Sequence, residues 1–223
     1  MQSTEAVPQP TYLHDPDGAC ELLLIRHGRS ADVVPGSPEA ADPGLHAEGD
    51  RQVAALAARL AGKRIDAVYA SHLARAMRTA EALAQPRALT VNVDADLREV
   101  ELGDWSDGEF RRRAATADPE WVAWSQTGRW AGIPGGETDE KLRARVVAVV
   151  DALAKRHVGG TIAVVAHGGA INAYIAEVVG AHRTIIATIE NTSITVVRVS
   201  QYGHIIVTVN DCHHLYDPVL DPS

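Results

Sequence analysis

Two short apolar runs constrain the fold of this chain more than any other feature of its sequence. The runs are Glu21-Leu-Leu-Leu-Ile25 and Thr161-Ile-Ala-Val-Val-Ala166, and neither shows the alternation expected of a strand with one face in water. Uninterrupted apolar runs of this length are typical of strands that helices cover on both faces. The sequence therefore predicts an α/β fold with these two runs as central strands.

The remaining segments alternate between helix and strand patterns. Ser71 is expected to cap one of the helices, which then continues to Pro86. Helical spacing of apolar residues is found in segments 47–60, 71–86, 138–157 and 170–179. Strand patterns are found in segments 65–70 and 90–93 and in a hairpin of 193–199 and 204–209. This order predicts an α/β sandwich with a mainly parallel sheet.

Two segments do not follow the alternation. Residues 1–19 mix Pro, Asp, Gly and Gln without periodicity, which predicts an N-terminal tail. Residues 102–135 interleave tryptophans with Arg111-Arg-Arg113, and we interpret them as a helical insertion with the tryptophans in its core. The expected organisation is a tail and then a single domain, residues 20–223, with the insertion at about 104–135.

Composition excludes several classes of partner. The chain has 21 Lys and Arg against 29 Asp and Glu, a net charge of −8, which disfavours binding to nucleic acid. Its apolar runs are too short to span a membrane, and the N-terminus does not resemble a secretion signal. We therefore expect a cytoplasmic protein in which Cys20 and Cys212 are free thiols. A homodimer through a sheet edge or the hairpin stays open.

A histidine follows each of the two apolar runs. His27 stands after the first and His167 after the second, and glycine comes next in both places, as Gly28 and Gly168. Open α/β sheets bind ligands at the carboxyl ends of their strands. A glycine there lets the backbone approach a ligand and leaves amides free, and a following helix N-terminus favours an anion. The pair predicts a phosphate site.

Two other interpretations of the histidines stay open. Each could be a buried histidine satisfied by hydrogen bonds at a strand end. A metal site is the second, because Asp211, Cys212, His213 and His214 could supply ligands. Neither a paired cysteine spacing nor a two-histidine helical motif supports a metal site, so phosphate is favoured.

The two histidines belong to an ordered series of short motifs. Its members are Leu24–Ser30, Ser71–Ala80, Leu97–Gly108, Gly135–Thr138, Val165–Gly169, Asn191–Ser193 and Asn210–His214. This series, which covers about residues 21–215, resembles the histidine phosphatase superfamily, which includes the cofactor-dependent phosphoglycerate mutases. The resemblance implies a three-layer α/β/α sandwich with a helical insertion after the acid motif, and its length and glycine-rich stretch at 134–138 favour the phosphatase branch.

The resemblance also implies roles for five side chains. His27 is the nucleophile, Glu99 is the general acid and base, and the phosphate ligands are Arg26, Arg75 and His167. The chemistry agrees, because two guanidinium groups can offset the charge of a phosphate dianion and a carboxylic acid can protonate the leaving oxygen. Glu101 is the competitor for the role of acid. The expected enzyme is a metal-independent phosphatase that uses no cofactor and hydrolyses a small phosphomonoester through a phosphohistidine.

Further positions are candidates for substrate contacts, and two positions depart from the family pattern. Ser30 either donates to phosphate or caps a turn, and Gly28 and Gly168 are expected to contact phosphate through the backbone. Arg111 is a candidate for a second anionic group of the substrate, although we favour a solvated helix face for Arg111–Arg113. The family pattern has Thr or Ser at position 46 and often Asn at position 33, where this chain has His46 and Val33.

Two other functions are compatible with the same motifs. A phosphoglycerate mutase would rephosphorylate its bound product instead of admitting water. A non-catalytic relative would bind a phosphorylated ligand without turnover, but such a protein is expected to have lost one of the five side chains, and all are present here.

Overall fold

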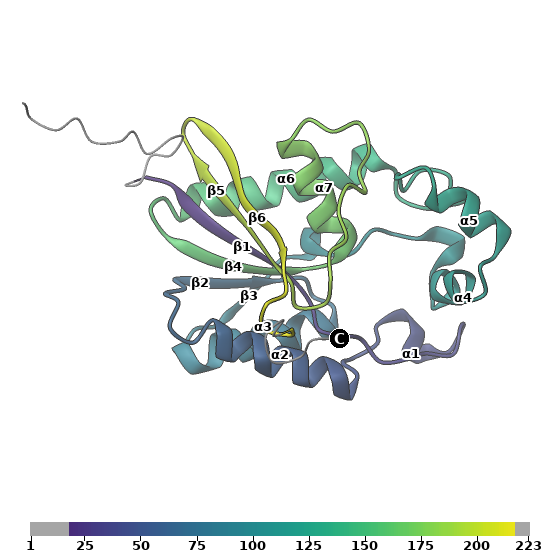
Figure 1. Ribbon diagram of the computed structural model, residues 1–223, viewed down its shortest axis with the longest axis horizontal. Coiled ribbons are helices and arrows are strands. Elements are labelled where there is room, and N and C mark those ends of the chain that lie inside the picture. The colour runs from purple at the N-terminus through teal and green to yellow at the C-terminus, as the bar shows by residue number, and fades with distance from the viewer. Residues whose placement is uncertain (1–17, 217–223) are drawn as a thin grey trace, which may run out of the picture.

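A six-stranded sheet lies at the centre of the chain, and helices cover both of its faces (Figure 1). The computed structural model describes residues 18–216, so most of the predicted tail lies outside the described residues. The strands are β1 (Cys20–Arg26), β2 (Ala67–Ala70), β3 (Val91–Val93), β4 (Thr161–Ala166), β5 (Ile194–Ser200) and β6 (Gly203–Asp211). Their order is β3-β2-β4-β1-β5-β6; the first four are parallel, β5 is antiparallel to β1, and β6 is antiparallel to β5. The predicted α/β sandwich is confirmed.

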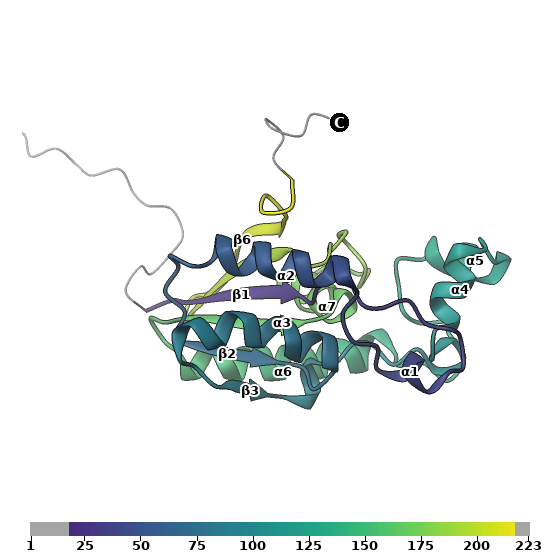
Figure 2. The same cartoon turned by 90° about the horizontal axis from the view of Figure 1, so that it is seen from below.

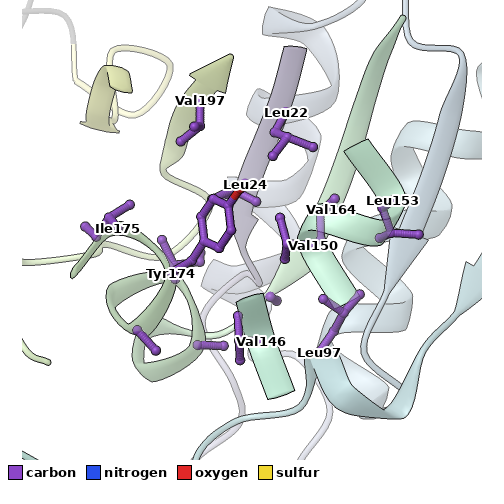
Figure 3. Packing of buried hydrophobic residues seen from close by; sticks show 14 of the residues in the cluster. Leu22, Leu24, Leu97, Val146, Val150, Leu153, Val164, Tyr174, Ile175 and Val197 are labelled. Atoms are coloured by element: carbon purple, nitrogen blue, oxygen red, sulfur yellow. The ribbon is translucent and has the colours of Figure 1, made fainter. Parts of the chain in front are cut away.

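Burial on both faces explains why β1 is apolar without alternation. Leu22 and Leu24 point into one cluster, shown in Figure 3, with α6 (Asp139–Arg156) and α7 (Gly168–Val178). Leu23 and Ile25 point into another cluster with α2 (Ala47–Arg59) and α3 (Ala74–Ala84). Figures 1 and 2 show these helix pairs on opposite sides of the sheet. The helices are α1 (Pro38–Ala41), α2 (Ala47–Arg59), α3 (Ala74–Ala84), α4 (Glu109–Ala115), α5 (Pro119–Ser125), α6 (Asp139–Arg156) and α7 (Gly168–Val178).

The start of α3 differs from the prediction. Ser71 does not cap this helix, which begins at Ala74 with Leu73 as its N-cap. The carboxylate of Asp42, from a distant loop, accepts the hydrogen bond of the Ala74 N–H at 3.0 Å and so takes the place of a local cap. Ser71 Oγ instead lies 2.9 Å from His167 Nε2.

The helices behind the two histidines also differ from the prediction. Helix α7 begins at Gly168, two residues before the predicted start at residue 170, so Gly168 and Gly169 belong to its first turn. No helix begins directly after Gly28, because the chain runs irregularly there before α1. The expected helix N-terminus therefore exists only behind His167.

The predicted insertion is confirmed and has an aromatic core. Helices α4 and α5 extend beyond the sheet (Figure 1), and Trp105, Phe110 and Trp124 pack with ring centroids 5.3–6.2 Å apart. Three short 3-10 helices flank the irregular parts of the chain, at Gln85–Arg87, Ala95–Leu97 and Gly103–Trp105.

Two further expectations concern the whole described chain. Cys20 and Cys212 are both free, as predicted. Within residues 18–216, each helix is too short or too polar to cross a membrane.

Candidate active site

The register of the central strands brings the two histidines together. Arg26 at the end of β1 pairs with Ala166 at the end of β4, so the next residues, His27 and His167, emerge side by side. Their ring centroids are 4.9 Å apart, and the exposed fractions of the two residues are 4% and 0%. Parallel pairing thus joins two motifs that lie far apart in the sequence.

Fixed partners determine which nitrogen of His27 carries the proton. Nδ1 lies 2.7 Å from the Gly28 carbonyl oxygen, which can only accept, so Nδ1 donates. Nε2 lies 3.2 Å from Arg75 Nε, which can only donate, so Nε2 accepts. His27 is therefore the neutral Nδ1–H tautomer, and the lone pair of Nε2 faces a guanidinium group.

The surroundings keep both imidazoles neutral. Burial, and then the positive charges of Arg75 and Arg26, lower the pKa of His27 well below its ordinary value of 6.5. Burial is also the main cause that lowers the pKa of His167. Burial lowers the pKa of Arg26 and Arg75 as well, but arginine titrates so far above neutral pH that both stay charged.

These shifts predict how the two histidines titrate. We expect the imidazoles of His27 and His167 to stay neutral until well below pH 6.5, as followed by the NMR shifts of their Cε1 protons. In the urea-unfolded chain the same imidazoles should titrate at the ordinary pKa. Just below pH 6.5, these two histidines take up protons in the unfolded chain but not in the folded protein. The free energy of unfolding should therefore fall as the pH drops below 6.5. A midpoint at or above 6.5 in the folded protein would contradict the prediction.

Seven buried side-chain N or O atoms lack a hydrogen-bond partner among the described residues, and two of them belong to predicted phosphate ligands. These two are Arg26 Nε and His167 Nδ1. A buried polar group without a hydrogen bond costs about 1–3 kcal/mol, so a ligand that supplies the missing partner is bound more tightly. Arg26 also lines the cleft described next, so its Nε is placed to contact a bound anion.

A cleft of 460 Å³ opens onto the side chains of Arg26 and His27. It is lined by His27, Arg26, Arg75 and Glu99 together with residues of the insertion. The Glu99 carboxylate accepts hydrogen bonds from the N–H of Val100 at 3.0 Å and of Gly169 at 3.3 Å. His167 is fully buried and is not among the lining residues, and its ring lies directly behind the cleft against that of His27.

Glu101, the predicted competitor, is placed differently from Glu99. It also lines the cleft, but its side chain is 61% exposed and is paired with Arg98 at 2.8 Å. Glu99 is therefore the carboxyl group that the fold holds in place.

The glycines behind the histidines have different surroundings. The Gly28 N–H donates to Thr79 Oγ1 at 3.1 Å, so the expectation that it is free for a ligand is wrong. A side chain at Gly28 would lie 2.8 Å from the Gly49 carbonyl oxygen in α2, which explains the glycine by packing. A Cβ at Gly168 would meet only the Arg26 side chain, at 3.7 Å, and its contact with substrate stays a prediction.

The arginine run divides between the cleft and the surface. Arg111 is exposed, as expected of a solvated helix face, but it also lines the cleft and donates to Ser30 Oγ at 2.8 Å and to the Ala31 carbonyl oxygen at 2.9 Å, so its contact with substrate stays a prediction. Arg112 is exposed as well and pairs with Glu109 at 2.6 Å on the insertion surface. Arg113 pairs with acidic residues of the insertion and lies 5.0 Å from the centre of the Trp105 ring.

The two departures from the family pattern lie outside the cleft. His46 still caps α2, because its Nδ1 accepts the Glu48 N–H at 3.1 Å. Val33 packs near Gly108 in the loop before α1. Neither residue is among the described residues that line the cleft.

The C-terminal motif residues support the sheet end. The Asn191 side chain donates to the His27 carbonyl oxygen at 2.9 Å, and Thr192 contacts His214 at 3.0 Å. His213 is paired with Asp211, and residues 18–216 contain no group of three or more potential ligands suited to a metal ion. The alternative metal site at 211–214 is therefore not formed.

Three contacts in the site were not anticipated from the sequence. Thr79 binds Gly28, Ser71 binds His167, and Gly169 binds the Glu99 carboxylate. The spacing of four between Arg75 and Thr79 could have revealed the first, because it places both on one helix face. The other two join distant parts of the chain and leave no local signal.

Comparisons with known proteins agree with this geometry. Residues 22–212 match the model of the histidine phosphatase superfamily, branch 1. A metal-independent phosphoserine phosphatase of Arabidopsis thaliana is 30% identical over 87% of this chain and 83% of its own length. Phosphoglycerate mutase-like protein 4 of the same plant is 31% identical over 80% and 79%. A mycobacterial glucosyl-3-phosphoglycerate phosphatase, solved with VO3, superposes with a TM-score of 0.72 at 27% identity, covering 85% of this chain and 98% of that one. The chain belongs to the histidine phosphatase superfamily and is an enzyme of that family.

Proposed function

We propose that this enzyme hydrolyses a small phosphomonoester through a phosphohistidine formed on Nε2 of His27, without a metal ion. The observation that carries the proposal is the neutral Nδ1–H tautomer of His27, whose Nε2 lone pair faces a guanidinium group. An imidazole nitrogen in this state is a nucleophile, and cations around it suit a phosphate dianion.

In the first half-reaction, His27 Nε2 attacks phosphorus and the bond to the leaving oxygen breaks. Arg26, Arg75 and His167 stabilise the charge on the equatorial phosphoryl oxygens. Arg75 Nε, which donates to Nε2 in the free enzyme, transfers its hydrogen bond to a phosphoryl oxygen as the lone pair is used. Glu99 gives its proton to the leaving oxygen, so the product departs as a neutral alcohol.

In the second half-reaction, water attacks the phosphohistidine. Glu99, now a carboxylate, takes a proton from this water, while the P–N bond breaks and His27 regains its lone pair. Inorganic phosphate then leaves the cleft. Glu99 lines the same cleft as His27, which supports one carboxyl group for both steps.

We further propose that Arg111 and Ser30 bind a second anionic group of the substrate. Arg111 reaches the cleft, and its donors are only partly used by Ser30 and Ala31. The relatives named as phosphatases of phosphoserine and of glucosyl-3-phosphoglycerate carry names of phosphorylated acids, which supports a carboxylate here.

Arg111→Met is expected to raise KM about 10- to 100-fold for phosphoserine or 3-phosphoglycerate, since a hydrogen bond to a charged group contributes about 1.5–3 kcal/mol. The KM for glycerol phosphate, which lacks the carboxylate, should change much less. Arg112→Met is the matched control, because Arg112 binds only Glu109 on the insertion surface. Equal effects of Arg111→Met on both kinds of substrate would contradict the second anion site.

One experiment separates the proposal from its two rivals. Phosphate release and isomerisation of 3-phosphoglycerate are measured in parallel, with and without a bisphosphoglycerate primer. The phosphatase releases inorganic phosphate whether or not primer is present. Primer-dependent isomerisation would identify a mutase, the rival that the name of the Arabidopsis mutase-like relative suggests. Binding of phosphorylated ligands without either reaction would identify a non-catalytic protein.

A further inference from the structure

We propose that Arg145 and Glu137 form a buried clamp that positions Glu99 for proton transfer. This inference rests on the proposed function, because it takes Glu99 as the acid. Neither residue lines the cleft, so both act through the backbone of the segment that carries the acid.

The clamp begins with a bidentate ion pair. Arg145 Nε and Nη2 each lie 2.7 Å from a carboxylate oxygen of Glu137, and the exposed fractions of the two side chains are 11% and 6%. Removing two opposite charges from water costs free energy even when they pair well. Apolar residues of similar volume often stabilise the folded protein as much as such a pair does. A function other than stability is therefore a reasonable cause for the pair.

The other donors of Arg145 bind the backbone around the acid. Nη1 donates to the carbonyl oxygens of Asp96 and Arg98 at 2.8 and 2.9 Å, and Nη2 donates to that of Glu99 at 3.0 Å. With the two bonds to Glu137, this uses all five N–H groups of the guanidinium. The two peptide groups that flank the Glu99 Cα are thus fixed to α6 through their carbonyl oxygens.

Glu137 holds the segment from its other end. Its Oε2 accepts the Glu101 N–H at 3.3 Å, and its own N–H donates to the Glu101 carbonyl oxygen at 2.8 Å. Residues 98–102 lie between two short 3-10 helices and belong to no strand. The segment therefore depends on these side-chain contacts for its position, and the Gly169 N–H then orients the carboxylate.

Arg143 provides a matched control on the same helix. It also donates to backbone carbonyl oxygens, those of Ala181 and Arg183, both at 2.8 Å, and to Thr184 Oγ1 at 3.1 Å. These contacts hold the loop after α7 and include none with residues 96–101. Its replacement disturbs α6 in a similar way without acting on the acid segment.

The test compares substrates whose leaving groups need the acid to different degrees. An alkyl phosphate such as glycerol phosphate requires protonation of its leaving oxygen, whereas p-nitrophenyl phosphate releases a stable anion. We measure kcat/KM for both, since this quantity reports the steps up to phosphoenzyme formation. The ratio of the two values does not depend on the fraction of folded enzyme, so an unstable variant remains informative.

Arg145→Lys keeps the positive charge but cannot make the five bonds. We expect it to lower the alkyl to aryl ratio at least 10-fold, in the same direction as Glu99→Gln, and Arg143→Lys to leave the ratio unchanged. In the double variant Glu99→Gln/Arg145→Lys, the ratio should equal that of Glu99→Gln, because the misplaced acid is already absent.

An unchanged ratio in Arg145→Lys, or a further fall in the double variant, overturns the clamp while leaving the proposed function intact. If Glu99→Gln itself leaves the ratio unchanged, Glu99 is not the acid, and the proposed proton transfer and the clamp both fail. If the wild-type enzyme releases no phosphate from either substrate, the proposed function fails as a whole.

Discussion

His27→Ala is expected to lower phosphate release by roughly four to six orders of magnitude, the scale seen when a nucleophile is removed from an enzyme that depends on it. Without Nε2 no phosphoenzyme can form, and Arg26, Arg75 and His167 then stabilise a phosphate that no group attacks. Rates are measured with p-nitrophenyl phosphate and with a phosphorylated acid. Retention of the same sheet by circular dichroism shows that the loss is chemical.

The phosphoenzyme itself supplies a second measurement. Rapid quenching of the wild-type enzyme at high pH, after mixing with substrate labelled in its phosphate, should leave label on His27 that acid removes. His72→Ala is the control, because His72 is an exposed histidine that lines the same cleft without a proposed role, and it should retain both label and activity within a few-fold. Label on another residue, or wild-type rates in His27→Ala, would refute the mechanism.

Gly169→Ala is expected to lower kcat/KM for alkyl phosphates by about 10²- to 10⁴-fold, the usual contribution of a general acid. A Cβ at this position would overlap Glu99 Oε1 and lie 3.0 Å from the Trp130 ring, so the carboxyl group must move. The loss would come despite a gain in helix propensity of about 1 kcal/mol for alanine over glycine. Activity on p-nitrophenyl phosphate should fall much less.

Gly168→Ala is the comparison for this second variant. The added methyl group meets only the Arg26 side chain at an ordinary contact distance, so the alkyl to aryl ratio should stay at the wild-type value whatever happens to phosphate affinity. If Gly169→Ala also keeps that ratio, Glu99 tolerates the displacement and the geometric argument is wrong.

The central strands could be predicted from the sequence because the signal for each strand lies within its own residues. Leu22 to Ile25 are apolar on both sides of β1 since helices cover both faces, and the same holds for β4. Together with the motifs, this sufficed to predict that His27 and His167 would meet at one end of the sheet.

Errors arose where distant side chains replaced local ones. The cap of α3 comes from Asp42, so Ser71 is free to contact His167. Gly28 is explained by the approach of α2, which nothing in its neighbourhood encodes. The arginine run could not show which member faces the cleft, because adjacent helical residues point in different directions and α4 has only 7 residues to define a face.

The parallel register of β1 and β4 has a consequence for how the enzyme acquires activity. The proposed nucleophile, His27, follows the first strand of the chain, whereas His167 follows β4, the last of the four parallel strands in chain order. A nascent or truncated chain that ends before β4 therefore contains His27 without His167, the proposed second ligand of the phosphoryl group. Recovery of turnover during refolding should accordingly not precede the pairing of β1 with β4.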